Sequence, residues 1–179
     1  MAGDKGFTLI ELLVLVAVVG ILATVAVPNF SATIKGDRDI SQINTLLSAM
    51  ALARSEAVKS GGNVLICSSS DGVTCAPSGT TSWSSGWSVQ YVTPPPNATT
   101  VIRSYPALGG GNTLNSGTAG NSITYSSNGM TNLAGTATFT LCDSRGVNYA
   151  RALDVLASGV TQTATTLGED VNGNPLSCP

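Results

Sequence analysis

An apolar segment near the start of the chain limits most strongly what this sequence can fold into. Residues 7–27 read FTLIELLVLVAVVGILATVAV, in which only Thr8, Glu11, Gly20 and Thr24 interrupt the apolar run. As an α-helix this segment would be about 30 Å long, which matches the hydrocarbon core of a bilayer. The segment therefore predicts a membrane-spanning helix at residues 7–27.

Two ordinary explanations account for this segment incompletely. A secretory signal peptide has a basic start and a small-residue cleavage site, but here Lys5 is offset by Asp4, and residues 24–26 make a poor cleavage site. A plain membrane anchor explains the length but not Glu11, because a carboxylate in a membrane helix costs about 2.5–3.5 kcal/mol on insertion scales. We therefore expect Glu11 to have a functional partner.

The residues around Glu11 suggest what that partner is. The stretch KGFTLIELL resembles the class III signal of type IV pilins and type II secretion pseudopilins. The resemblance implies that residues 1–6 form a leader, that a prepilin peptidase cleaves after Gly6, and that the new N-terminal residue, Phe7, is methylated. It also implies that Glu11 meets the N-terminal amine of a neighbouring subunit, whose positive charge offsets the desolvation of the carboxylate.

Two further positions fit the same resemblance. Gly20 and Pro28 fall where family members often carry Gly and Pro. Proline removes a helical hydrogen bond, and glycine weakens a helix interior by about 1 kcal/mol relative to alanine. The helix is therefore expected to kink or partly melt between them, and the resemblance implies that this segment can unwind in an assembled filament. The alternative is an ordinary proline of a membrane helix.

Residues 28–62 continue the helix in an amphipathic form. Apolar residues recur at spacings of three and four and form one stripe, with Asp37 and Asp39 off it. The glycine pair at 61–62 predicts the end of the helix. The stretch ARSEAVKSG at 53–61 resembles the narrower group of FimT/FimU-type minor pilins and GspH-type pseudopilins. The stripe consists of Ile40, Ile43, Leu46 or Leu47, Met50, Ala53 and Ala57.

Beyond residue 62 the pattern alternates as in β-strands, with loops rich in Gly, Ser, Asn and Pro. A helix followed by strands predicts an α+β fold with one antiparallel sheet on a helix face, and the resemblance implies the pilin fold, with a β-rich head at 63–179. The segment ARALDVLASG at 150–159 also has helical propensity. The candidate strands are Asn63–Cys67, Gly86–Val92, Thr99–Tyr105, Ser122–Ser126, Ala137–Cys142 and Ala150–Leu156.

The composition limits the chemistry of this head. The chain contains no histidine, which removes Ser-His-Asp and Cys-His nucleophile pairs and the commonest transition-metal ligand. Asp170, Asn172 and Asn174 alternate like half of a calcium loop, but the closing glutamate is absent and turn chemistry explains the spacing. We therefore predict no enzyme activity, no metal and no cofactor.

Four cysteines in an exported domain indicate two disulfides. The sequence contains no CxxC pair, so a zinc site is not expected. Three connectivities are possible. We predict the sequence-local one, with Cys67 bonded to Cys75 and Cys142 bonded to Cys178. The first bond would pin a short loop, and the second would tie the C-terminal tail to a strand.

Four other residues in the head have simple interpretations. The pattern W..GW.V recurs in the FimT/FimU/GspH group; Trp87 follows strand alternation and is predicted to be core, whereas Trp83 is either core or a surface contact. Asp143 and Arg145 are interpreted as a turn between two strands.

The charge distribution argues against nucleic acid as a ligand. The net charge is −2 and the eight Lys and Arg residues are scattered, whereas phosphate binding draws on clustered cations. DNA-uptake FimT proteins carry a basic G-R-x-R stretch, but residues 159–162 read GVTQ here. Only Arg145 and Arg151 lie nearby in the sequence.

The resemblance as a whole implies a minor pilin of the FimU/FimT type, which joins or primes the tip of a type IV pilus. Its partners would be other major and minor pilins, the prepilin peptidase, and the inner membrane before assembly. The head would be periplasmic and then extracellular. Three alternatives stay open: a type II secretion pseudopilin of the GspH type, a FimT-like DNA-binding pilin, and a host-surface adhesin.

Overall fold

The computed structural model describes residues 6–93 and 98–179, without the side chains of residues 25–29. Within it the chain forms two compact units, Met1–Arg38 and Asp39–Pro179, which are described separately here. The predicted leader at 1–6 therefore lies, except for Gly6, outside the described residues.

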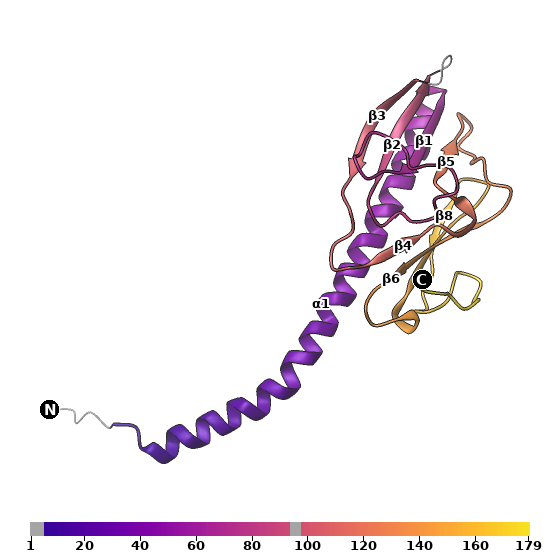
Figure 1. Cartoon of the computed structure of the whole chain (residues 1–179). Helices are drawn as coiled ribbons and strands as arrows, with labels where there is room; N and C mark the ends of the chain where they lie inside the picture. The colour runs from indigo at the N-terminus through magenta and orange to yellow at the C-terminus, as the bar shows by residue number, and fades with distance from the viewer. Residues whose placement is uncertain (1–5, 94–97) are drawn as a thin grey trace. The chain divides into compact units, whose positions relative to one another are not determined.

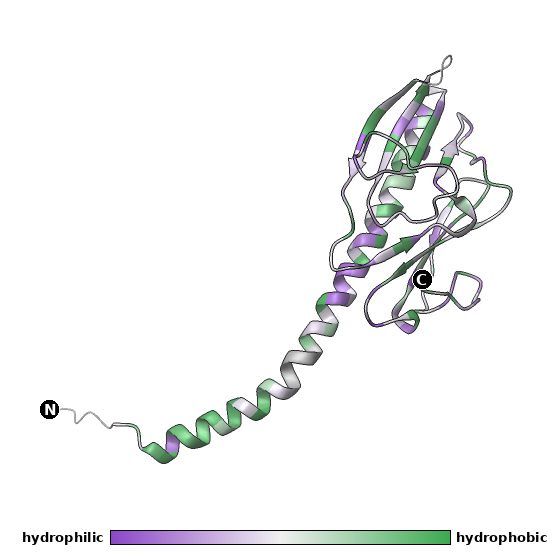
Figure 2. Ribbon diagram, in the orientation of Figure 1, coloured by the Kyte–Doolittle hydropathy of each residue, from purple (hydrophilic) through white to green (hydrophobic). Residues whose placement is uncertain are grey.

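The first unit contains the beginning of a single long helix, α1 (Leu9–Ser60), drawn in indigo and purple in Figure 1. The helix continues through Gly20 and Pro28. Figure 2 shows that its first turns are hydrophobic almost throughout. Among the described residues, no helix is long and apolar enough to cross a membrane, so the span predicted at 7–27 is not confirmed.

In the second unit, α1 contributes one buried stripe to the core. The prediction of this stripe is wrong at one end, because Ile40 is 42% exposed whereas Asp39 is only 2% exposed. The helix ends at Ser60, directly before Gly61, which has a φ of +68° and so adopts the left-handed conformation of a helix stop. The stripe consists of Asp39, Ile43, Leu46, Ala49, Met50, Ala53 and Ala57.

The strands form two four-stranded antiparallel sheets, in the orders β3-β2-β1-β5 and β4-β6-β7-β8, where one sheet was predicted. Strand β1 is central in the first sheet, where Ile66 pairs with Val89 and Ile123. In the second sheet Phe139 pairs with Leu153. The strands are β1 (Asn63–Ser68), β2 (Trp87–Thr93), β3 (Ala98–Tyr105), β4 (Thr113–Asn115), β5 (Ser122–Tyr125), β6 (Ala137–Cys142), β7 (Arg151–Val155) and β8 (Thr161–Thr163).

All six predicted strands are present, and the segment with helical propensity forms β7. The two strands that were not predicted, β4 and β8, have three residues each. A three-residue strand shows too little alternation to be distinguished from a loop. Two short 3₁₀ turns complete the fold, η1 (Gly117–Ala119) and η2 (Val147–Tyr149).

One hydrophobic core joins the α1 stripe to both sheets. Trp87 is buried in it, as predicted, and stacks on Tyr105. Trp83 is also fully buried: its ring meets Phe139 edge to face at 5.0 Å, and its indole N–H donates to the carbonyl of Gly120 at 2.8 Å. The interpretation of Trp83 as a surface contact is therefore wrong.

Two disulfides close the head, with the sequence-local connectivity that was predicted. Cys67 at the end of β1 is bonded to Cys75 in the following loop. Cys142 at the end of β6 is bonded to Cys178, and this bond holds the C-terminal tail. Both bonds link a buried strand to a polar segment, so they fix loops that the hydrophobic core does not cover.

Candidate functional site

The predicted processing point lies in extended chain ahead of α1. Gly6 and Phe7 precede the first helical residue, Leu9. Phe7 is 83% exposed, so both sides of the Gly6–Phe7 peptide bond are accessible and no helical hydrogen bonds need to break to reach it.

Glu11 is part of the N-terminal cap of the helix. Its carboxylate Oε2 accepts hydrogen bonds from the backbone N–H and the hydroxyl of Thr8, each at 3.0 Å. In return, the Glu11 backbone N–H donates to Thr8 Oγ1 at 3.3 Å. This reciprocal arrangement is a capping box, in which a Thr and a Glu three residues apart satisfy the free donors of the first turn. Glu11 therefore helps to start the helix as well as carrying a charge.

The same carboxylate lies on an apolar face of the helix. Phe7, Ile10, Val14 and Leu15 line one groove with Glu11. Eleven Leu, Ile and Val side chains between residues 9 and 22 are each between 48% and 76% exposed. An exposed apolar surface of this kind marks a site of interaction with protein or membrane. Gly20 and Pro28 lie within the helix, and their role in its flexibility stays a prediction.

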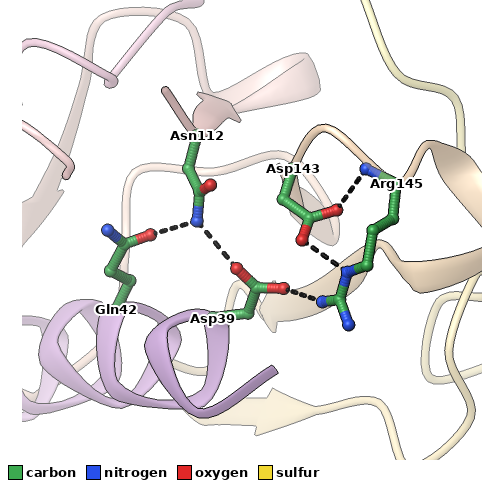
Figure 3. Close-up of polar contacts among 5 residues, drawn as sticks. All are labelled: Asp39, Gln42, Asn112, Asp143 and Arg145. Carbon is green, nitrogen blue, oxygen red and sulfur yellow. Dashed lines mark hydrogen bonds and ion pairs between the residues drawn. The ribbon is translucent and has the colours of Figure 1, made fainter. Parts of the chain in front are cut away.

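In the second unit, a polar network joins the buried stripe of α1 to the turn after β6 (Figure 3). Arg145 Nη2 lies 2.7 Å from Asp39 Oδ2, and Arg145 Nε lies 2.6 Å from Asp143 Oδ2. The Arg145 backbone N–H also donates to Asp143 Oδ1 at 2.8 Å. The guanidinium carbon lies 4.5 Å from the centre of the Tyr149 ring. One arginine therefore holds two carboxylates and an aromatic ring.

The other oxygen of Asp39 is also bound. Asn112 Nδ2 donates to Asp39 Oδ1 and to Gln42 Oε1, each at 2.7 Å. Burial raises the pKa of Asp39; the hydrogen bond from Asn112 and the charge of Arg145 oppose this rise, whereas the charge of Asp143 adds to it. Asp39 is thus a desolvated carboxylate that depends on its partners.

The network contains contacts that the sequence interpretation missed. Asp143 and Arg145 do form the predicted turn, but the bond of Arg145 to Asp39 spans 106 residues, which no local pattern shows. One signal for Asp39 was available: the alternating three-and-four spacing of the stripe, continued backward from Ile43, leads to residue 39 rather than 40.

The other polar candidates have hydrogen-bond or ion-pair partners within the second unit. Asp170 Oδ1 accepts the backbone N–H groups of Asn172 and Asn174, each at 2.8 Å, so this segment forms a hydrogen-bonded turn. No group of three or more Cys, Asp or Glu side chains in the described parts of the chain is arranged to hold a metal ion. Glu56 accepts a short hydrogen bond from Tyr91 and lies 3.6 Å from Lys59.

Comparison with known families decides what kind of chain this is. Residues 42–159 match the family described as type II transport protein GspH. The chain belongs to the GspH family. Residues 1–27 match the prokaryotic N-terminal methylation motif, which contains Gly6, Phe7 and Glu11.

This GspH-family chain is also similar to individual known proteins. Two fimbrial proteins of Pseudomonas aeruginosa are 42% identical to it over 52 residues, which are 27% of this chain and 34% of theirs. The chain thus spans about a third of the length of these curated relatives. Two crystal structures of the type IV minor pilin FimU of P. aeruginosa cover 78% of this chain and 98% and 99% of their own, at 22% identity and TM-scores of 0.58 and 0.55. This likeness confirms the predicted α+β pilin fold.

Proposed function

We propose that this chain is a minor pilin that is built into a type IV pilus, at or near its tip, as a structural subunit rather than an enzyme. The observation that carries the proposal is the N-terminal methylation motif at residues 1–27, which includes an exposed apolar helix face. A face of this kind needs a second helix or lipid to cover it. Neighbouring subunits with the same motif would supply such helices.

Processing would begin at the exposed Gly6–Phe7 bond. A prepilin peptidase would hydrolyse this bond, which leaves a carboxylate on Gly6 and a free amine on Phe7. It would then transfer a methyl group to that amine from a sulfonium methyl donor, which leaves as the thioether while the amine loses a proton. Before assembly the apolar half of the helix would lie in the inner membrane with the head on the periplasmic side. After assembly the head would be on the outside of the cell.

Glu11 would then set the register of the subunit in the filament. Its carboxylate lies on the apolar face with Ile10 and Val14, where a charge without a partner is unfavourable in a helix bundle. The ammonium group on Phe7 of a neighbour provides the opposite charge. Pairing between these two groups would favour one longitudinal position among similar apolar helices.

Replacement of Gly6 tests the processing step. We expect Gly6→Ala to keep residues 1–6 attached, visible as a higher intact mass, and to prevent N-methylation. Gly135→Ala is a matched control, because a methyl group there meets no atom within 4 Å, and its product should have the processed mass. Loss of the leader from Gly6→Ala, or its retention in the unaltered chain, would contradict the proposal.

A second candidate is a type II secretion pseudopilin, and the match of residues 42–159 to GspH favours it specifically. Both candidates predict the same processing, so Gly6→Ala does not separate them. Complementation does: a minor pilin restores pili in a minor-pilin mutant, and a pseudopilin restores secretion in a secretion mutant. A DNA-binding role has weaker support, since the 159–162 segment has no arginine.

A further inference from the structure

Natural proteins protect the outer edges of their sheets, because unpaired backbone groups there pair readily with other chains. In the described residues, the outer edge of β5 is closed by Asn132: the Thr124 N–H donates to Asn132 Oδ1 at 2.8 Å, and the Thr124 carbonyl accepts from the Asn132 N–H at 3.0 Å. The outer edge of β4 is closed at Leu114, whose carbonyl accepts from the Trp83 N–H at 2.8 Å and whose N–H donates to Ser84 Oγ at 2.9 Å.

The two remaining edges differ in length. Strand β8 has three residues, too few to pair extensively. Strand β3 has eight and pairs with β2 on one side only, as the outermost arrow of its sheet in Figure 1 shows. Across residues 6–93 and 98–179, no backbone hydrogen bond from another segment reaches its outer side.

The first half of β3 has the composition of a strand that receives a partner. Ala98, Thr99, Thr100 and Val101 are all exposed, and none is charged or a proline, the residues with which edge strands are usually blocked. A bulge lies opposite the Val89–Gln90 step of β2, which limits the regular edge to Ala98–Val101. Along that edge alternate residues direct a backbone N–H and C=O outward.

We propose that the outer edge of β3, over Ala98–Val101, binds an extended strand of a neighbouring filament subunit, so that its sheet gains a fifth strand. Main-chain hydrogen bonds would give the affinity, as in other cases of strand addition. Four residues of pairing are few, so the contact depends on the high effective concentration within an assembly. This proposal rests on the proposed function in one respect only, namely that the added strand comes from another filament subunit.

The side chains of β3 indicate the sequence that fits. Thr99, Thr100 and Val101 favour β-branched residues opposite them, and the exposed Arg103 favours a carboxylate at the end of the added strand. The expected partner segment is therefore extended and β-branched, with one acidic residue.

Crosslinking from within the edge tests the proposal. A photoreactive amino acid placed at Thr99 of the full chain, in cells that assemble the filament, is expected to give an adduct with another pilin, identified by mass spectrometry. Adding Val101→Lys should abolish the adduct, because a charge on the edge opposes strand pairing. Val73→Lys is the matched control, since Val73 is exposed in a loop, and it should leave the adduct unchanged.

Hydrogen exchange supplies the readout that is specific for a strand. Those amides of Ala98–Val101 that face away from β2 should exchange more slowly in sheared filaments than in the full chain in detergent micelles. Absence of an adduct from every cell fraction, an adduct with a protein that is not a filament subunit, or equal exchange in both states would each overturn the proposal. Detection of the chain in sheared filaments tests the proposed function separately, because it does not depend on β3.

Discussion

Arg145 Nη2 lies 2.7 Å from Asp39 Oδ2, and this ion pair fastens the turn after β6 to the first buried residue of the α1 stripe. The Asp39 side chain is 3% exposed and that of Arg145 is 17% exposed. Removing one partner of such a pair leaves a buried charge without compensation, which destabilises a protein more than the intact pair stabilises it.

We therefore expect Arg145→Ala to lower the free energy of unfolding of the full chain by about 3 kcal/mol, measured by chemical denaturation. Arg145→Lys should recover only part of the loss, because a lysine cannot bind two carboxylates in a fixed fork. Arg103→Ala is the control, since Arg103 is exposed on β3 and should change stability by less than about 1 kcal/mol. Equal effects of Arg145→Ala and Arg103→Ala would mean that the network is not a stabilising contact.

One pair of substitutions separates the observed capping by Glu11 from the charge pairing that we propose for it. Glu11→Ala removes the cap and the charge and should block incorporation into filaments. Glu11→Gln keeps an acceptor for the Thr8 N–H, since glutamine also serves in a capping box, but removes the charge. If the charge pairs with a neighbouring amine, Glu11→Gln fails like Glu11→Ala in sheared filaments; normal incorporation of Glu11→Gln would reduce the role of Glu11 to capping.

The approach of Gly159 to Gly129 is another contact that substitution can test. A Cβ atom on Gly159 would lie 1.9 Å from the carbonyl oxygen of Gly129, and Gly159 has a φ of +79°. We expect Gly159→Ala to destabilise the head by about 3 kcal/mol or more, because backbone must move. Gly79→Ala isolates the backbone strain, since Gly79 has a φ of +90° with open space around it, and should cost about 1–2 kcal/mol. Equal melting temperatures for the two variants would refute the close contact.

The two disulfides should differ in their contribution to stability. Cys67 and Cys75 are 8 residues apart, and Cys142 and Cys178 are 36 apart. If a disulfide acts by restricting the unfolded chain, the losses on replacing each pair by serine are about 2.5 and about 4 kcal/mol. Denaturation of both double variants checks this order. The opposite order would show that the short loop stabilises the folded state itself.

Tyr125 should make the head sensitive to alkali. Its hydroxyl is buried without a hydrogen-bond partner in the described residues, and burial raises its pKa from 10.0 to about 12. Because the folded state resists ionisation, stability is retained below the unfolded pKa and falls as pH rises through the folded one. Tyr125→Phe should reduce this loss of stability at high pH. Chemical denaturation between about pH 9 and about pH 12, a range that includes both pKa values, measures the difference. If the stability of Tyr125→Phe falls at alkaline pH as steeply as that of the unaltered chain, Tyr125 is not the cause of the fall.

The sequence predicted the elements of this fold better than their assembly. Glycine at 61 stopped the helix where expected, and the longer strands showed clear alternation. The division into two sheets could not be predicted from the sequence. It involves strand β4, which is short, and residues 82–84, which close the outer edge of β4 and have no regular pattern.

The candidate site shows the same limit. Gly6 and Phe7, proposed for processing, and Glu11, proposed for assembly, belong to one contiguous motif, so the sequence contains the whole pattern. The Asp39–Arg145 pair joins two residues that are 106 positions apart in the sequence, and Asp39 was predicted to lie off the apolar stripe. The spacing of the stripe points to position 39, but burial of a carboxylate there is explained only once its partner is known.

The positions of the disulfides also have a consequence in time. Cys75 follows Cys67 so closely that this pair can meet as soon as its own loop is made, since closing a short loop is fast. Cys142 must wait until a further 36 residues have been made before its partner, Cys178, exists. A chain that enters an oxidising compartment N-terminus first would therefore complete the Cys67–Cys75 crosslink well before the Cys142–Cys178 crosslink, and trapping thiols at intervals during synthesis would show the two events in that order.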